Sequence, residues 1–254
     1  YGPEITFTTA MPPIATTAAT AITTNSAVCG GAITSATGGT VSARGVCWDT
    51  RPDPTIALAT KTQNGAGDGT FTANLTGLSV LTQYYVRAYA TIGTNTVYGE
   101  QRSFNTAGPP VQDIDGNTYE VIGLGTQVWF KQNLRTGKYR NGEVIGQNLS
   151  ASAWSSTTTG ACAEYSDSPV NGAKYGKLYN FHAVVDPRNV CPTGWRVPDM
   201  TDWQTLYGYL LGLSEYTGGI VKTTGTTAAG NGDWLAPNAL ATNSTGFSVL
   251  PAGS

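Results

Sequence analysis

The sequence is poor in charge, has a single histidine and lacks a long apolar run. Of its 254 residues only 12% are charged, and the formal net charge is −2. This weak basic character excludes nucleic acid as a partner, because too few cations are present to neutralise a phosphate backbone. No run of about 18 apolar residues occurs, which excludes insertion into a membrane as a helix.

The start of the chain also lacks the marks of an export signal. Tyr1-Gly2-Pro3-Glu4 contains neither a basic stretch nor an apolar one. Thr, Ser, Gly and Asn are abundant, as is typical of secreted β-proteins. We therefore expect an extracellular, secreted or cell-surface protein from which any signal has been removed. A length of 254 residues favours one large or two ordinary domains.

The single histidine limits the chemistry available to the chain. Nucleophilic catalysis pairs a nucleophile with a base, and His182 is the only imidazole. It lies in the apolar, strand-like run from Asn180 to Val184, where we expect a packed side chain. Asp199 and Asp202 stand at the start of a predicted helix, and the helix dipole explains them without catalysis. We predict no enzyme activity and no cofactor; a hydrolase that depends on His182 is kept as an alternative.

The cysteines fall in two local pairs, Cys29 with Cys47 and Cys162 with Cys191. Four cysteines allow three connectivities, and only this one keeps both bridges inside the domains predicted below. Zinc is the rival interpretation, but the chain has no CxxC spacing and a single histidine. We expect two disulfides and, with them, an oxidising extracellular location.

A short acidic segment has part of the pattern of a calcium loop. Asp113, Asp115 and Asn117 have the 1-3-5 spacing of such a loop. Thr118 stands at the sixth position, where an EF-hand has glycine, and Leu124 at the twelfth, where it has glutamate. We therefore interpret the segment as a hairpin with an Asp-Gly turn and predict no metal site.

Short strands separated by turns fill the segment from about Ser26 to Phe104. Val41–Trp48 and Tyr84–Ala90 are the clearest strands, because packing side chains alternate between their faces. The glycines from Gly65 to Gly69 mark a turn between strands. Strands about ten residues apart, with turn signals between them, indicate a β-sandwich.

This sandwich resembles the fibronectin type III-like repeats of Bacteroidetes surface proteins over residues 10–107. The resemblance rests on Ala43-Arg44-Gly45-Val46-Cys47-Trp48, Leu75-Thr76-Gly77-Leu78 and Tyr84-Tyr85-Val86-Arg87-Ala88-Tyr89-Ala90. It implies an all-β, immunoglobulin-like fold. Leu78, Thr82 and Tyr84 stand where that family has its leucine, threonine and corner tyrosine, whereas Val80 replaces a usual proline.

Residues 108–110, Gly108-Pro109-Pro110, break the chain, because prolines cannot donate to a ladder and stiffen a linker. A second domain is expected at residues 111–254. Its one convincing helix spans Thr201–Leu213, with Thr201 and Gln204 in a capping-box pattern. Apolar residues recur there at helical spacing and predict a core-facing helix on a sheet. They are Trp203, Leu206, Tyr207, Leu210 and Leu211.

Many motifs in the expected order make the second domain resemble the Fibrobacter succinogenes major paralogous domain. They are Asp113–Tyr119, Gln127–Trp129, Asn133-Leu134, Tyr175–Asn180, Cys191–Pro198, Trp203 and Thr242–Phe247. That family is similar to C-type-lectin-like and formylglycine-generating-enzyme-like folds. The resemblance implies an α+β, C-type-lectin-like domain with many loops in an exported surface protein. The sequence stops at Ser254, before the family's final strands, so a truncated domain is expected.

Aromatic side chains provide a glycan-binding hypothesis. Trp154, Trp195 and Trp234 lie beside Ser, Thr, Gly and Asn in predicted loops. Exposed rings would stack on sugars, as the lectin-like resemblance implies; the competing interpretation is that they plug the core of a loop-rich fold. Glycosylation of the chain itself is a further expectation, because N-linked sequons begin at Asn74, Asn148 and Asn243.

An internal repeat gives the most specific hypothesis. Residues 1–14 align with residues 98–111, with Tyr, Gly, Phe, Thr, Ala and both prolines identical. The second copy is the last strand of the sandwich with its linker, so residues 1–9 are an orphan strand. The apolar face of that strand is formed by Tyr1, Pro3, Ile5 and Phe7.

A lone strand leaves its backbone donors unpaired, so we expect a neighbouring molecule to hold it. Strand donation adds one chain's strand to another chain's sheet. The head-to-tail contact does not close and therefore builds a fibre of identical subunits. The sequence thus predicts a structural subunit of an extracellular, pilus-like filament. Two alternatives stay open: residues 1–9 end a preceding domain of a longer protein, or the chain is a carbohydrate-binding adhesin module of a larger surface protein.

Overall fold

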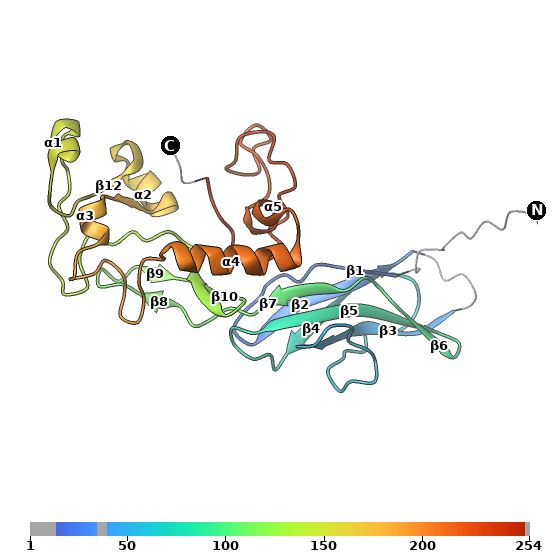
Figure 1. Cartoon of the computed structure of the whole chain (residues 1–254). Coiled ribbons are helices and arrows are strands. Elements are labelled where there is room, and N and C mark those ends of the chain that lie inside the picture. The colour runs from blue at the N-terminus through green and yellow to red at the C-terminus, as the bar shows by residue number, and fades with distance from the viewer. Residues whose placement is uncertain (1–13, 35–39, 252–254) are drawn as a thin grey trace, which may run out of the picture. The chain divides into compact units, whose positions relative to one another are not determined.

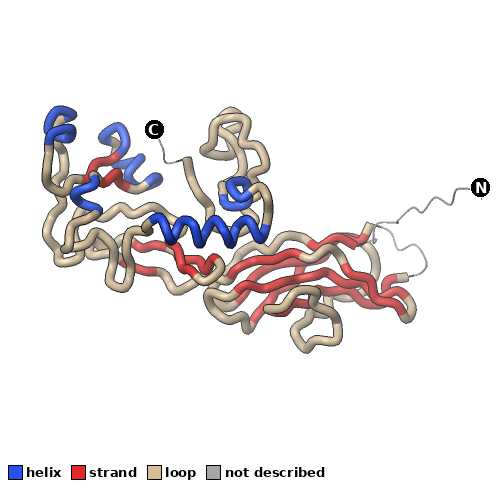
Figure 2. Tube along the Cα trace, in the orientation of Figure 1, coloured by secondary structure: helices blue, strands red, loops and turns tan. Residues whose placement is uncertain are grey.

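The computed structural model describes residues 14–34 and 40–251. The chain divides into two compact units, Tyr1–Thr106 and Ala107–Ser254. Over the described ranges, the first unit contains strands and loops, and the helices belong to the second unit (Figures 1 and 2). None of the helices within these ranges has the length and hydropathy that a membrane span requires.

The first unit is a sandwich of two antiparallel sheets. One sheet has the strand order β1-β2-β4, and the other has β3-β5-β6, with β7 also paired to β5. The strands are β1 (Ile14–Thr16), β2 (Ser26–Ile33), β3 (Val41–Asp49), β4 (Gly69–Thr76), β5 (Gln83–Ile92), β6 (Asn95–Tyr98) and β7 (Arg102–Asn105). This order is that of an immunoglobulin-like, fibronectin type III-like sandwich.

Alternation along the strands builds the core of this sandwich. In β5, Tyr84, Val86, Ala88 and Ala90 belong to one buried cluster, so the face predicted from the sequence is confirmed. The predicted corner tyrosine is also confirmed, because the Ser79 backbone N–H donates to the Tyr84 hydroxyl at 2.9 Å.

The second unit mixes short hairpins, short helices and loops. Its strands are β8 (Val111–Gln112), β9 (Thr118–Tyr119), β10 (Val121–Leu124), β11 (Gln127–Phe130), β12 (Cys162–Glu164) and β13 (Lys177–Tyr179). They pair as the hairpins β8-β9 and β10-β11 and as the pair β12-β13. Its helices are α1 (Ala151–Ser156), the 3-10 turn η1 (Tyr165–Asp167), α2 (Pro169–Tyr175), α3 (Phe181–Val184), α4 (Met200–Leu213) and α5 (Thr217–Val221).

The segment that connects the two units is tied to the second. Ala107 forms a bridge with Ile122, and the Gly108 N–H donates to the Val121 carbonyl at 3.0 Å. The prolines Pro109 and Pro110 follow before β8 begins. Gly108 is therefore part of a ladder, whereas the sequence places it in a linker.

Helix α4 is present where the sequence predicts it, but its cap and its buried face differ. Asp199 is the N-cap residue and forms the capping box with Asp202, so the predicted box of Thr201 with Gln204 is wrong. The carboxylate of Asp199 accepts from the Thr201 and Asp202 N–H groups, and Thr201 is already the second residue of the helix, so it is not the cap. Within the helix only Leu206 and Leu210 are buried.

Candidate functional site

Among the described residues of the sandwich there is one long unpaired sheet edge, which is the outer side of β4. Strand β4 ends the β1-β2-β4 sheet and pairs with β2 alone over Gly69–Thr76. Its core-facing side contributes Ala73 and Leu75 to the buried cluster, with Phe71 packed partly buried against it. The alternate residues are exposed. An edge of this kind is a template for another strand.

The hydrogen-bond pattern of β2 shows which groups of β4 are free. The Gly30 carbonyl accepts from Thr17 at 3.1 Å, on the β1 side of β2. Backbone groups alternate along a strand, so the neighbours of Gly30 bond to β4, at Phe71 and Ala73. The backbone groups of the intervening residues therefore point away from β2. These residues are Thr70, Thr72, Asn74 and Thr76.

One of these free groups is capped by a side chain. The Asn64 amide donates from Nδ2 to the Thr72 carbonyl at 2.7 Å. The same side chain accepts from the Thr62 hydroxyl at 2.7 Å, which fixes its orientation. No charged residue or proline lies in β4 itself. Natural sheets often protect an edge with such residues, so β4 is protected at a single carbonyl.

The other described edges of the sandwich are occupied or broken. The outer side of β3 carries bonds from the segment 60–65, including Thr62 N–H to the Val46 carbonyl at 2.8 Å. Strand β1 has three residues, and its Thr16 hydroxyl accepts from the Ala88 N–H at 3.0 Å. Strands β6 and β7 have four residues each and are interrupted between Tyr98 and Arg102. The outer side of β4 is thus the longest continuous edge in the described sandwich.

The residues predicted for the subunit interface lie outside the described ranges. They are Tyr1, Pro3, Ile5 and Phe7. The sequence predicts that this segment is a donated strand, but it does not predict which edge would receive it. The alternation of Phe71, Ala73 and Leu75 with exposed polar residues was the signal for β4, but that alternation alone does not distinguish an edge strand from a central one.

The predicted disulfides are absent, because all four cysteines are free and buried. Cys29 belongs to the core between the two sheets and donates to the Thr17 carbonyl at 3.2 Å. Cys47 points to the opposite face of β3 from its neighbours Val46 and Trp48, which are in that core. Its thiol lies 3.4 Å from the Pro54 carbonyl oxygen. The two sulfurs therefore lie on different faces of β3, and the pairing of Cys29 with Cys47 is wrong.

Cys162 and Cys191 share a buried cluster of the second unit, but they too are free thiols. Burial raises the pKa of each thiol to about 11. Few thiolates exist at neutral pH, so neither sulfur is an activated nucleophile. The argument from disulfides to an oxidising location therefore loses its support.

The three tryptophans predicted as glycan contacts are all half-buried. Trp195 packs on Phe130 with ring centroids 4.2 Å apart and borders a buried cluster, so it is a core plug. Trp234 donates to the Thr223 hydroxyl at 2.9 Å and lies under the Lys222 ammonium. Trp154 lies on α1. The structure does not bring the three rings together as a platform.

A different aromatic surface lies on α4, which we call the α4 stripe. Met200, Trp203, Tyr207 and Leu211 follow one another at helical spacing and are 71%, 50%, 55% and 47% exposed. Trp203 is held from below by Trp129, with centroids 4.9 Å apart. The prediction that Trp203, Tyr207 and Leu211 lie in the core is wrong. Helical spacing of apolar residues shows that they share a face, but it does not show whether another element covers that face.

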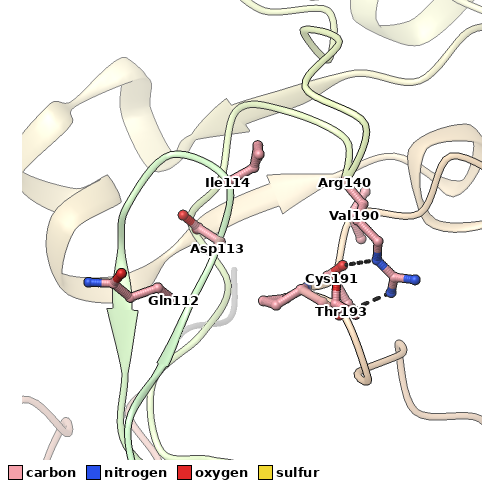
Figure 3. Close-up of a pocket in the computed structure, with 8 residues that line it drawn as sticks. Gln112, Asp113, Ile114, Arg140, Val190, Cys191 and Thr193 are labelled. Carbon is pink, nitrogen blue, oxygen red and sulfur yellow. Dashed lines mark hydrogen bonds between the residues drawn. The ribbon is translucent and has the colours of Figure 1, made fainter.

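A shallow cavity of about 180 Å³ opens in the second unit between the β8-β9 hairpin and the Cys191–Thr193 loop (Figure 3). Arg140 lines it and donates to the carbonyls of Cys191 at 2.9 Å, Pro192 at 3.0 Å and Trp195 at 2.8 Å. These bonds hold the loop that carries the Cys-Pro-Thr-Gly-Trp motif. The arrangement explains the motif as packing around Arg140.

The acidic hairpin uses its carboxylates internally. Asp113 accepts from the N–H groups of Asp115 and Asn117 at 2.9 Å and from the Tyr119 hydroxyl at 2.6 Å. Asp115 pairs with Lys138 at 2.8 Å. Protein donors therefore take the positions that a cation would need. Over residues 14–34 and 40–251, no group of three or more His, Cys, Asp or Glu side chains is placed to hold a metal ion.

The predicted packed histidine is exposed. His182 lies on the short helix α3, capped by the Asn180 side chain, which accepts from Ala183 N. Only Ala183 of that helix is buried. The apolar run around His182 is therefore a helix turn with a solvent-facing imidazole, and the strand-like interpretation is wrong.

These features define a protein of two units, a fibronectin type III-like sandwich and a loop-rich unit, with two exposed surfaces that suit interaction. The chain belongs to the family of the Fibrobacter succinogenes major domain, whose model matches residues 122–254. No curated protein matches the chain.

Solved structures similar to the chain are fibronectin type III domains and a sensor domain. The sensor domain of the anti-sigma factor RsgI4 of Pseudobacteroides cellulosolvens is 16% identical, with 39% of this chain and 97% of that chain covered and a TM-score of 0.30. The fibronectin type III domain of the human KIAA0970 protein is 16% identical, with 42% and 81% covered and a TM-score of 0.30. These scores are low, and the strand order itself defines the sandwich.

Proposed function

We propose that this chain is a structural subunit of an extracellular bacterial filament, in which residues 1–9 of one subunit add a strand to the next. The internal repeat supports this proposal, because residues 1–9 repeat the last strand of the sandwich. The low charge and the abundance of Thr, Ser and Gly support an extracellular location.

One observation carries the proposal. In the sandwich the place of the last strand beside β5 is already filled, by β6 from Tyr89 to Ile92 and by β7 from Gln83 to Val86. Residues 98–106 thus occupy the position that their repeat, residues 1–9, would take. That place is filled in every copy of the chain, so we propose that residues 1–9 pair with a different sheet edge of the next copy.

The test compares the full chain with a chain that lacks residues 1–9, by sedimentation velocity and negative-stain electron microscopy. We expect filaments or large assemblies from the full chain and folded monomers from the shorter one. Assemblies that persist unchanged without residues 1–9 would overturn the proposal.

A matched pair of substitutions tests the apolar face. Ile5→Asp places a charge where the donated strand meets the sandwich, whereas Thr6→Asp places it on the opposite face. Burial of an isoleucine side chain contributes about 1.5–3 kcal/mol, so Ile5→Asp should raise the concentration needed for assembly about 10- to 100-fold. Thr6→Asp should change it little.

A second candidate function is carbohydrate binding by a C-type-lectin-like second unit, and the α4 stripe favours it. Trp203 and Tyr207 lie one helical turn apart and are half-exposed. Exposed aromatic rings suit the apolar faces of sugars. Binding of the full chain to a panel of soluble polysaccharides should be lost in Trp203→Ala and kept in Leu235→Ala, an exposed residue outside the stripe. Equal binding by both variants would contradict this function.

A further inference from the structure

We infer that the outer edge of β4 is the acceptor, and that residues 1–9 of a second copy pair with it in antiparallel direction. This inference rests on the proposed function and names the surface that the donated strand meets.

Backbone N–H and C=O groups point to alternate sides along a strand, and this alternation fixes which residues of the donor form hydrogen bonds with β4. The free backbone groups of β4 belong to residues whose side chains face solvent, namely Thr70, Thr72, Asn74 and Thr76. Residues directly opposite in an antiparallel ladder have side chains on the same face. The donor must therefore bond through the residues of its polar face, which are Gly2, Glu4, Thr6 and Thr8.

The one proline of the donated strand fits this arrangement. Pro3 has no N–H and lies on the apolar face with Ile5 and Phe7. In the antiparallel arrangement that face covers the sandwich beside Phe71, and its backbone groups point away from β4. Pro3 therefore costs no ladder bond. A parallel arrangement would direct the Pro3 nitrogen at β4, and a slip of one residue would turn Glu4 toward the core.

The two strands have similar lengths, and their full overlap gives a register. Strand β4 has eight residues, and the donor spans residues 1–9. Full overlap places Thr6 opposite Thr72 and Glu4 opposite Asn74. The Asn64 amide, which donates to the Thr72 carbonyl at 2.7 Å, must release that oxygen before Thr6 pairs with it. Asn64 therefore acts as a removable cap on the edge.

The decisive experiment replaces one backbone donor. Thr72→Pro removes an N–H that points away from β2, so the ladder with β2 is kept, as is usual for proline in edge strands. Thr72→Ala is the matched control, because it shortens the same exposed side chain and keeps the N–H. Both are made in the full chain, and thermal unfolding confirms the fold. We expect Thr72→Pro to raise the assembly concentration at least about tenfold and Thr72→Ala to leave it unchanged.

The outcomes separate this inference from the proposed function. Normal assembly of Thr72→Pro, together with loss of assembly on deletion of residues 1–9, would overturn the β4 assignment and leave strand donation standing. If neither Thr72→Pro nor deletion of residues 1–9 affects assembly, both the β4 assignment and strand donation are overturned. If Thr72→Pro does not fold, Asn64→Ala decides: release of the Thr72 carbonyl should lower the assembly concentration several-fold, and an unchanged or raised concentration would contradict the assignment.

Discussion

At the scale of single residues, all four cysteines are buried free thiols, so their reactivity measures whether the protein is folded. Burial raises the pKa of Cys47, Cys162 and Cys191 to about 11 and raises that of Cys29 as well. Reactive thiolates are therefore scarce at neutral pH, and the sulfurs are shielded from solvent. The thiols of the folded protein should not react with alkylating reagents.

Treatment with iodoacetamide, followed by measurement of the intact mass, tests whether the thiols are protected. We expect no adduct on the native chain at pH 7 and four adducts after denaturation without reductant. Zero adducts on the denatured chain would mean two disulfides, and would contradict the free thiols of the structure.

Asp115 gives a residue-scale prediction for pH. Burial alone would raise the pKa of this carboxyl, but hydrogen bonds from Lys138, Gly137 and Thr136 outweigh it and lower the pKa below 3.8. A carboxyl with a lowered folded pKa stabilises the protein above its unfolded pKa, and the stabilisation disappears as the pH falls through the folded value.

Asp115→Asn should therefore destabilise the second unit by about 1–3 kcal/mol at pH 7. The difference from the parent chain should shrink as the pH falls from about 5 toward 2, where the parent carboxyl is protonated. Thermal unfolding at a series of pH values measures both. A difference that stays constant over that range would contradict the role of the carboxylate.

At the scale of elements, α4 has one face in the core and one in solvent. Leu206 is 3% exposed and packs in the cluster with Ile122 and Phe247, whereas Leu211 is 47% exposed. Leu206→Ala should destabilise the second unit by about 2–5 kcal/mol, because it leaves a cavity. Leu211→Ala should change the stability of the second unit by no more than about 0.5 kcal/mol. Denaturant unfolding compares them, and similar costs would show that the stripe is covered in the folded protein.

The elements differ in how far the sequence predicts them. Strands β3 and β5 and helix α4 follow from periodicity, because the periodicity of the side chains is set by the backbone geometry. Helix α3 does not, because one helical turn is too short to show a period, and its cap at Asn180 was the only local signal.

The sites depend on information that periodicity lacks. Cys29 and Cys47 are close in sequence, yet Cys29 on β2 lies in the core between the sheets and Cys47 on β3 points away from it, and only the pleat and register decide that. The exposure of Trp203 and the edge position of β4 depend on what packs beside them, which sequence spacing does not encode. The repeat in the sequence predicts the proposed donor segment, whereas the proposed acceptor edge follows only from the strand order.

At the scale of the whole molecule, the proposed donor strand and the outer edge of β4 are two different surfaces of one chain, each of which would pair with the other surface on a neighbour. Such a heterologous contact repeats without closing and gives a filament rather than a dimer. The edge of β4 is the least protected in the described sandwich, with one carbonyl capped by Asn64. Assembly should therefore depend on the backbone of β4 more than on its exposed side chains.

The most direct test joins the two partners covalently. A chain with Thr6→Cys and Thr72→Cys places one new thiol on the donor and one on β4, while the four native thiols stay buried. Opposite residues of an antiparallel ladder are within disulfide range. Mild oxidation should give a ladder of covalent multimers on a non-reducing gel, and each single variant should give at most dimers. Monomers alone from the double variant, or an internal bridge within one chain, would contradict donation of residues 1–9 to the β4 edge of a neighbour.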